Sequence, residues 1–130
     1  MARATADIGT INYTTALMAG RHPLTADERP ALGGKDTGAA PHELLCAALA
    51  ACTAITLSMY AGRKSWPLRA AHVDVLFQQE GEKRTMTRRL RLEGDLDEAQ
   101  RARLADIAER TPVTLTLRQG VAITTILEPL

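Results

Sequence analysis

An uncharged apolar segment, residues 44–61, constrains the fold of this chain more than any other feature. It reads LLCAALAACTAITLSMYA. A helix that is apolar on all sides either spans a membrane or forms the core of a protein. The segment is rich in alanine and also carries Thr53, Thr56, Ser58 and Tyr60, and polar strands are expected beside it. We therefore predict the core helix of a soluble domain and no contact with a membrane.

The residues around this segment predict where the helix begins and ends. Pro41 suits the first helical position, and Glu43 places a negative charge in the first turn, where the helix dipole favours it. Gly62 suits the position directly after the last turn. The sequence thus predicts a helix from Pro41 to about Gly62.

Alternation of apolar and polar residues, together with turn residues, predicts the other elements. Asp97 and Gln100 have the spacing of a capping box, and Pro112 is expected to end that helix. Strands are expected at 8–18, 22–26, 71–79, 84–93 and 120–127, with a further short strand considered at 113–117, a loop at 27–40 and a helix at 97–110.

The resulting order, β-β-α-β-β-α-β, predicts an α+β fold in a single domain, residues 1–130, since this length is typical of one domain. In the hairpin 71–93, Met86, Leu90 and Leu92 are expected to face inward. We expect Arg88, Arg89 and Arg91 to form its solvated face.

Charge and packing limit the partners of the chain. A net charge of +1 gives no electrostatic reason to expect nucleic acid or an anionic membrane. A helix as apolar as 44–61 needs cover on all sides, more than one small sheet and one helix supply. We therefore expect a homodimer.

The two cysteines, Cys46 and Cys52, lie in the apolar segment, and no basic leader or cleavage site precedes them. This predicts a cytoplasmic protein rather than a secreted disulfide scaffold. Six residues of helix separate the two Cα atoms by ~9 Å and ~120°, too far for a disulfide. With His22, His42 and His72 they match no ligand spacing, so neither a metal nor another cofactor is expected.

Taken by itself, Cys52 has two interpretations. A free cysteine in an alanine-rich helix is usually a small buried apolar residue. A reactive cysteine needs a nearby cation or a helix N-terminus, and Cys52 is about three turns into its helix. Arg21 is one candidate for such a cation.

Several stretches of the sequence together resemble one known family. They are Asp27-Glu28, Leu32–Gly38 (LGGKDTG), Pro41–Leu45 (PHELL), Ala51–Ala61 (ACTAITLSMYA), Lys64–Leu68 (KSWPL), Arg89–Leu96 and Thr111–Val113 (TPV). The chain resembles the OsmC/Ohr family of osmotically inducible and organic-hydroperoxide-resistance proteins, in its short OsmC-like branch. The resemblance implies antiparallel sheets around a long central buried helix, in an intertwined homodimer with its active sites at the interface.

The resemblance also implies an activity, the thiol-dependent reduction of organic hydroperoxides. Cys52 matches the peroxidatic cysteine, which becomes a sulfenic acid that a second, resolving cysteine converts to a disulfide. In this chain Thr111 stands where the family has the resolving cysteine, and Thr114 stands where the family motif has a histidine. An external thiol would then have to attack the sulfenic acid of a one-Cys cycle.

The resemblance further implies an acidic residue and an arginine that stabilise the thiolate. His42 falls at the acidic position, with Glu43 one residue on, and Arg21 or Arg29 supplies the arginine. The expected catalytic residues are accordingly Cys52, Arg21 and Glu43. The expected binding residues are His42, Thr111 and Thr114.

Two functions remain open from the sequence. The retained Cys52 favours a one-Cys peroxidase that acts on small organic hydroperoxides. The absence of a resolving cysteine at position 111 favours a catalytically degenerate dimeric module that binds a small apolar ligand.

Overall fold

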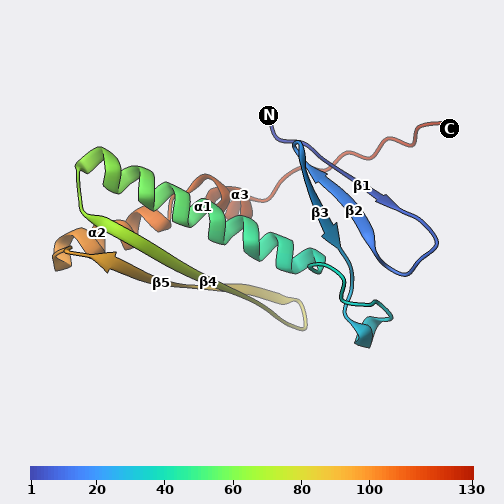
Figure 1. The fold of residues 1–130 in the computed structure, drawn as a ribbon, viewed down its shortest axis with the longest axis horizontal. Coiled ribbons are helices and arrows are strands. Elements are labelled where there is room, and N and C mark those ends of the chain that lie inside the picture. The colour runs from blue at the N-terminus through green and yellow to red at the C-terminus, as the bar shows by residue number, and fades with distance from the viewer. The chain divides into compact units, whose positions relative to one another are not determined.

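The uncharged segment forms one long helix, α1 (Pro41–Lys64), which confirms the predicted helix (Figure 1). The helix continues past Gly62 to Lys64, so Gly62 lies inside it rather than after it. Ser65, with a positive φ of 56°, occupies the position directly after the last turn that was predicted for Gly62.

The computed structural model describes residues 1–130. The chain forms two compact units, Met1–Ala47 with Phe77–Thr85 and Ala48–Leu76 with Met86–Leu130. The α+β class and its antiparallel sheets agree with the prediction, and the observed order is β-β-β-α-β-β-α-α.

The first unit is built on a three-stranded antiparallel sheet in the order β1-β2-β3. Its strands are β1 (Ala4–Ile8), β2 (Thr15–Ala19) and β3 (His22–Ala26). The prediction of one strand over 8–18 is wrong, because Ile8 pairs with Thr15 and the chain reverses between them. Threonine and isoleucine signal β-propensity but do not say where a strand turns back. The strand at 22–26 is confirmed.

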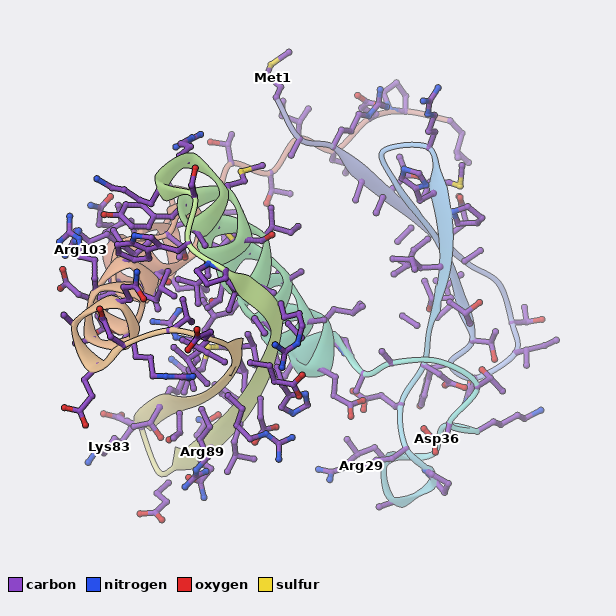
Figure 2. All side chains as sticks on the ribbon, turned by 60° about the vertical axis from the view of Figure 1, so that its left-hand side comes forward. Met1, Arg29, Asp36, Lys83, Arg89 and Arg103 are labelled. Atoms are coloured by element: carbon purple, nitrogen blue, oxygen red, sulfur yellow. The ribbon has the colours of Figure 1, made fainter.

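The loop predicted at 27–40 is confirmed and contains a short 3-10 helix, Pro30–Leu32. Its organising side chain is Asp27, which is 2% exposed. The Asp27 carboxylate accepts hydrogen bonds from the backbone N–H groups of Tyr13, Glu28, Lys35 and Thr37 and from the hydroxyls of Thr14 and Thr37. Arg29 and Asp36, by contrast, are exposed on the same loop (Figure 2). One buried carboxylate thus accepts six hydrogen bonds, from the loop and from the residues before β2.

The second sheet is the hairpin of β4 (Leu68–Glu80) and β5 (Lys83–Gly94), with Gly81 at a φ of +61° in its turn. Both predicted strands are confirmed and are longer than expected. Helix α2 (Glu98–Ala108) follows, and the capping box between Asp97 and Gln100 is present in both directions, as predicted.

The end of the chain differs from the prediction. Residues 113–117 are not a strand but belong to helix α3 (Pro112–Gln119), with Thr111 as its N-cap. Pro112 starts this helix, because its fixed φ suits the first helical position. The strand predicted at 120–127 is also absent. Residues 120–130 pair with neither sheet and are exposed throughout.

The core of the second unit is formed by α1, α2 and the segment between β5 and α2. Its buried members are Leu57, Ala61, Leu96, Leu104 and Ala108. Partly buried residues pack against them from both strands, both helices and the connection between α1 and β4, namely Tyr60, Trp66, Leu68, Leu90, Leu92 and Ile107. The buried members are all leucine or alanine, in a chain that has only one Trp, one Phe and two Tyr.

Helix α1 buries only one stripe in the single chain. Its buried residues, Leu49, Thr53, Leu57 and Ala61, recur every four positions. By length and composition alone α1 could cross a membrane, and 22% of its apolar window is buried. The rest of this apolar helix is open to a further partner.

Candidate functional site

The thiol of Cys52 is free and half-buried on α1. Its Sγ lies 4.0 Å from Oγ1 of Thr56, one helical turn further on. Either atom of this pair can donate, and the intermediate burial leaves part of the Cys52 residue accessible to solvent. Cys52 is therefore a free thiol with part of its surface exposed, and its expected catalytic role remains a prediction.

Cys46 is also free and half-buried. Because it lies on the same continuous helix, it is ~9 Å from Cys52 along the axis and ~120° around it. The expectation that the two cysteines form no disulfide with each other is confirmed.

The residue after Cys52 begins a buried polar cluster. Thr53 is fully buried, and its hydroxyl donates to the carbonyl oxygen of Leu49 over 2.7 Å. The Thr53 hydroxyl oxygen in turn accepts a hydrogen bond of 3.0 Å from Nη1 of Arg88. The same nitrogen donates to Oγ1 of Thr114 over 2.8 Å.

Thr111 and Thr114, both predicted as site residues, meet in this cluster. Thr111 is fully buried, and its Oγ1 lies 2.7 Å from Oγ1 of Thr114. The Thr114 hydroxyl donates its proton to the carbonyl of Ala108 over 3.2 Å, so it accepts from Thr111. Thr111 also accepts from the backbone N–H of Thr114 and thereby caps α3.

A half-exposed carboxylate closes the cluster. Glu109 accepts from Nη2 of Arg88 over 2.9 Å and from Nη2 of Arg118 over 2.8 Å. The bond from Arg118, followed by that from Arg88, holds the pKa of Glu109 below its usual range. We call Arg88, Thr53, Thr111, Thr114 and Glu109 the Arg88 cluster.

The prediction that Arg88 belongs to the solvated face of the hairpin is wrong. Its side chain is 11% exposed, whereas its neighbour Arg89 is exposed (Figure 2). The alternation along the strand contained the signal, because Met86 and Leu90 were expected inward and Arg88 shares their parity. An inward arginine with three acceptors avoids the cost of an unpaired buried charge.

The other predicted site residues lie in the first unit. Arg21 is exposed at the turn between β2 and β3, and Arg29 is exposed on the following loop. The ring of His42 stacks on Phe77, with centroids 4.5 Å apart. The expected roles of Arg21 and His42 remain predictions.

Glu43 performs a structural task at the start of α1. Its Oε1 accepts from the backbone N–H of Ala40 over 2.9 Å. Nine residues of helix separate it from Cys52, about 13 Å along the axis and on the opposite face. Within one chain, α1 therefore does not direct the Glu43 carboxylate toward the thiol.

A shallow groove of about 500 Å³ runs beside α1 in the second unit. It is lined by Ala54, Ile55, Ser58 and Met59 of α1 and by the β4 residues Leu68, Arg69, Ala70 and Ala71. Met59 follows Cys52 by seven residues, so the two share a face of the helix. The groove offers apolar contacts with one hydroxyl and one guanidinium.

Known proteins resemble this chain at two levels. The sequence profile of the family described as OsmC-like protein matches residues 34–126. No curated protein sequence matches the chain.

Solved structures share the fold. An OsmC-like protein from Mycoplasma pneumoniae has a TM-score of 0.78 at 20% identity, covering 91% of this chain and 87% of its own. An organic hydroperoxide resistance protein from Legionella pneumophila has a TM-score of 0.66 at 22% identity, covering 91% and 89%. One from Elizabethkingia anophelis has a TM-score of 0.67 at 20% identity, covering 91% and 88%.

Proposed function

This chain belongs to the OsmC-like protein family, and from that premise we propose that it reduces small organic hydroperoxides through the thiol of Cys52 in a one-Cys cycle. The observation that carries the proposal is the free, half-buried Cys52 on the central helix. Two structural neighbours are named organic hydroperoxide resistance proteins, which supports the same substrate class.

The cycle consists of three balanced steps. The Cys52 thiolate attacks one peroxide oxygen, the O–O bond breaks, and the alkoxide takes a proton and leaves as an alcohol. An external thiol then attacks the sulfur of the sulfenic acid, which forms a mixed disulfide and releases water. A second external thiol displaces Cys52 from the mixed disulfide and leaves as a small disulfide.

The lack of a second cysteine within reach of Cys52 supports an external thiol as the group that attacks the sulfenic acid. Thr111 and Thr114 stand buried at the start of α3 and hold no sulfur, and Cys46 is out of reach along the helix. A supply of reducing thiols is typical of the cytoplasm, so we propose that compartment.

We propose a homodimer as the working form. Large apolar side chains of α1 and of the unpaired C-terminal segment are exposed, namely Leu45, Ile55, Met59, Val121, Ile123, Ile126 and Leu127. Exposed apolar side chains gathered on a helix and on an unpaired segment are typical of a surface that a protein partner covers. In the dimer, the second copy pairs with residues 120–127 as a strand and covers the open face of α1.

In this proposal Arg21 and Glu43 of one protomer assist the Cys52 thiol of the other at the dimer interface, with His42 beside the substrate. Arg21 has an exposed guanidinium, and a partner chain could reach it at its turn. The variants Arg21→Met and Glu43→Gln test these roles. Each should slow hydroperoxide consumption about tenfold or more if it acts on the reacting atoms.

The test of the activity is hydroperoxide consumption with cumene hydroperoxide and excess dithiothreitol. The parent and Cys46→Ser should turn over, and Cys52→Ser should not. A sulfenic acid at Cys52, trapped with dimedone and located by mass spectrometry, identifies the intermediate. Equal rates for the parent and Cys52→Ser would refute the peroxidase.

The second candidate function is a non-catalytic module that binds a small apolar ligand. The groove beside α1 favours it, because its lining is largely apolar and one lining residue, Met59, shares a helix face with Cys52. Fluorescence titration with a small apolar dye distinguishes the binding module from the peroxidase. Binding that Met59→Asp abolishes, in a protein that consumes no hydroperoxide, would support the module.

A further inference from the structure

Arg88 lies on β5, but its guanidinium contacts three other parts of the second unit. It donates to Thr53 in α1, to Thr114 in α3 and to Glu109 directly after α2. A guanidinium is planar and donates in fixed directions, so three acceptors on it hold a fixed mutual geometry. We propose that Arg88 is a positioning residue for Cys52, one that fixes α1 at the turn of the thiol against the first turn of α3.

The link to the thiol runs through Thr53. Thr53 follows Cys52, with Cα atoms about 3.8 Å apart, and a helix turns as a rigid body over so short a span. Holding the Thr53 hydroxyl on Arg88 therefore fixes the direction in which the Cys52 side chain leaves α1. This inference rests on the proposed function of Cys52.

The link is independent of the redox state of the protein. The hydrogen bonds from the Arg88 guanidinium to the hydroxyls of Thr53 and Thr114 involve no sulfur atom, so oxidation of the thiol consumes none of these groups. Arg88 thus keeps the start of α3 in place in the thiol and in the sulfenic acid forms. The sulfenic acid stays available to an external thiol, as the one-Cys cycle requires.

The cluster permits a clean substitution. Without Arg88, the Thr53 hydroxyl keeps its bond to Leu49, and the Thr114 hydroxyl keeps Ala108 and Thr111. Arg88→Met therefore leaves neither hydroxyl unpartnered. Arg88→Lys keeps the charge but replaces the planar fork with a single ammonium. The exposed neighbour supplies the control, Arg89→Met.

The experiment compares these variants in the full-length protein, each also carrying Cys46→Ser so that Cys52 is the only thiol. The temperature is one at which thermal unfolding shows every variant to be folded. Amide hydrogen exchange is measured over 50–57 and 112–119. The rate of Cys52 oxidation by tert-butyl hydroperoxide is measured by loss of thiol. Arg88→Met and Arg88→Lys should exchange about tenfold faster in both segments and oxidise about tenfold slower, whereas Arg89→Met stays within about twofold of the parent.

Three results would overturn the assignment. The first is an amide exchange rate in Arg88→Met equal to that of the parent. The second is faster amide exchange with no decrease in the rate of Cys52 oxidation. The third is a Cys52 oxidation rate in Arg88→Lys equal to that of the parent, which would mean that only the charge of Arg88 matters. If Cys52 in the parent does not react with the peroxide, the proposed function fails, and the exchange data alone decide whether Arg88 fixes the two segments. Should Arg88→Met not fold, Thr53→Val removes one acceptor, keeps the cation and carries the same comparison.

Discussion

Arg88 and Thr53 are 35 residues apart in the sequence, yet Nη1 of the arginine lies 3.0 Å from Oγ1 of the threonine. The contact joins the hairpin to the buried stripe of α1, at the residue that directly follows Cys52. A buried threonine hydroxyl in a helix usually bonds back to a carbonyl of the preceding turn, and Thr53 does so with Leu49. Its second partner ties it to the tertiary structure.

Removing the hydroxyl of Thr111 should destabilise the protein. Thr111→Val keeps the shape but loses the N-cap of α3 and the bond to Thr114, so we expect a loss of about 1–2 kcal/mol in the free energy of unfolding. Urea unfolding measures it. Thr116→Val is the control, since Thr116 is exposed on the same helix and should change stability by less than about 0.5 kcal/mol. Equal effects would argue against the cap.

Truncating Leu104 should leave a cavity in the core of the second unit. The side chain is fully buried against α1, so Leu104→Ala should cost about 2–5 kcal/mol. Leu115→Ala, at a position that is 40% exposed, should cost less than about 1.5 kcal/mol. Chemical unfolding of both variants checks this, and a cost below 1 kcal/mol at Leu104 would contradict the packing described.

Asp27 should make the stability of the first unit sensitive to acid. The Thr37 hydroxyl, with the backbone N–H groups of Thr37, Glu28 and Tyr13, holds the pKa of Asp27 well below its usual range. A carboxyl with a lowered pKa in the folded state contributes its full stability above the unfolded pKa of about 4 and loses it as the pH falls further. Asp27→Asn should therefore lower the melting temperature at pH 7, and the difference should shrink toward pH 2.

The matched control for Asp27 is Asp36→Asn, at an exposed position on the same loop. It should melt within about 2 °C of the parent at both pH values, because its carboxylate is open to solvent. Parallel melting curves for the parent and Asp27→Asn across this range would show that Asp27 is not the group that titrates.

Gly62→Ala should stabilise the protein by about 0.5–1 kcal/mol. Gly62 lies inside α1, and a Cβ there would meet no atom within 4 Å, so alanine removes chain entropy without a clash. Gly81→Ala is the counterpart. Its φ of +61° strains any other residue, and we expect a loss of about 1 kcal/mol. Thermal unfolding should show a melting temperature above that of the parent for Gly62→Ala and below it for Gly81→Ala.

A charge on the C-terminal segment should weaken the proposed dimer. Ile126 is 78% exposed in the single chain, so Ile126→Asp leaves the folded units intact but opposes burial between copies. Sedimentation should show a dimer for the parent and a shift toward monomer for the variant. A parent that sediments as a monomer, or an unchanged dimer for Ile126→Asp, would contradict the proposal.

The sequence by itself determined the elements whose signals are local. The uncharged run and Pro41 define α1, the alternation at 71–93 defines the hairpin, and the Asp97–Gln100 spacing defines the start of α2. Each rests on contacts within a few residues, which a sequence pattern records directly. The motifs around Cys52 likewise sufficed to assign the family.

Only the tertiary structure decided what depends on distant partners. It turned Arg88 inward onto Thr53 and Thr114, and it gathered the donors that surround Asp27. It also made residues 112–119 a helix and left 120–130 without a strand partner. A strand exists only where a second edge pairs with it, and an arginine is buried only where acceptors converge, so the chain sequence near each residue carries too little information to decide either outcome.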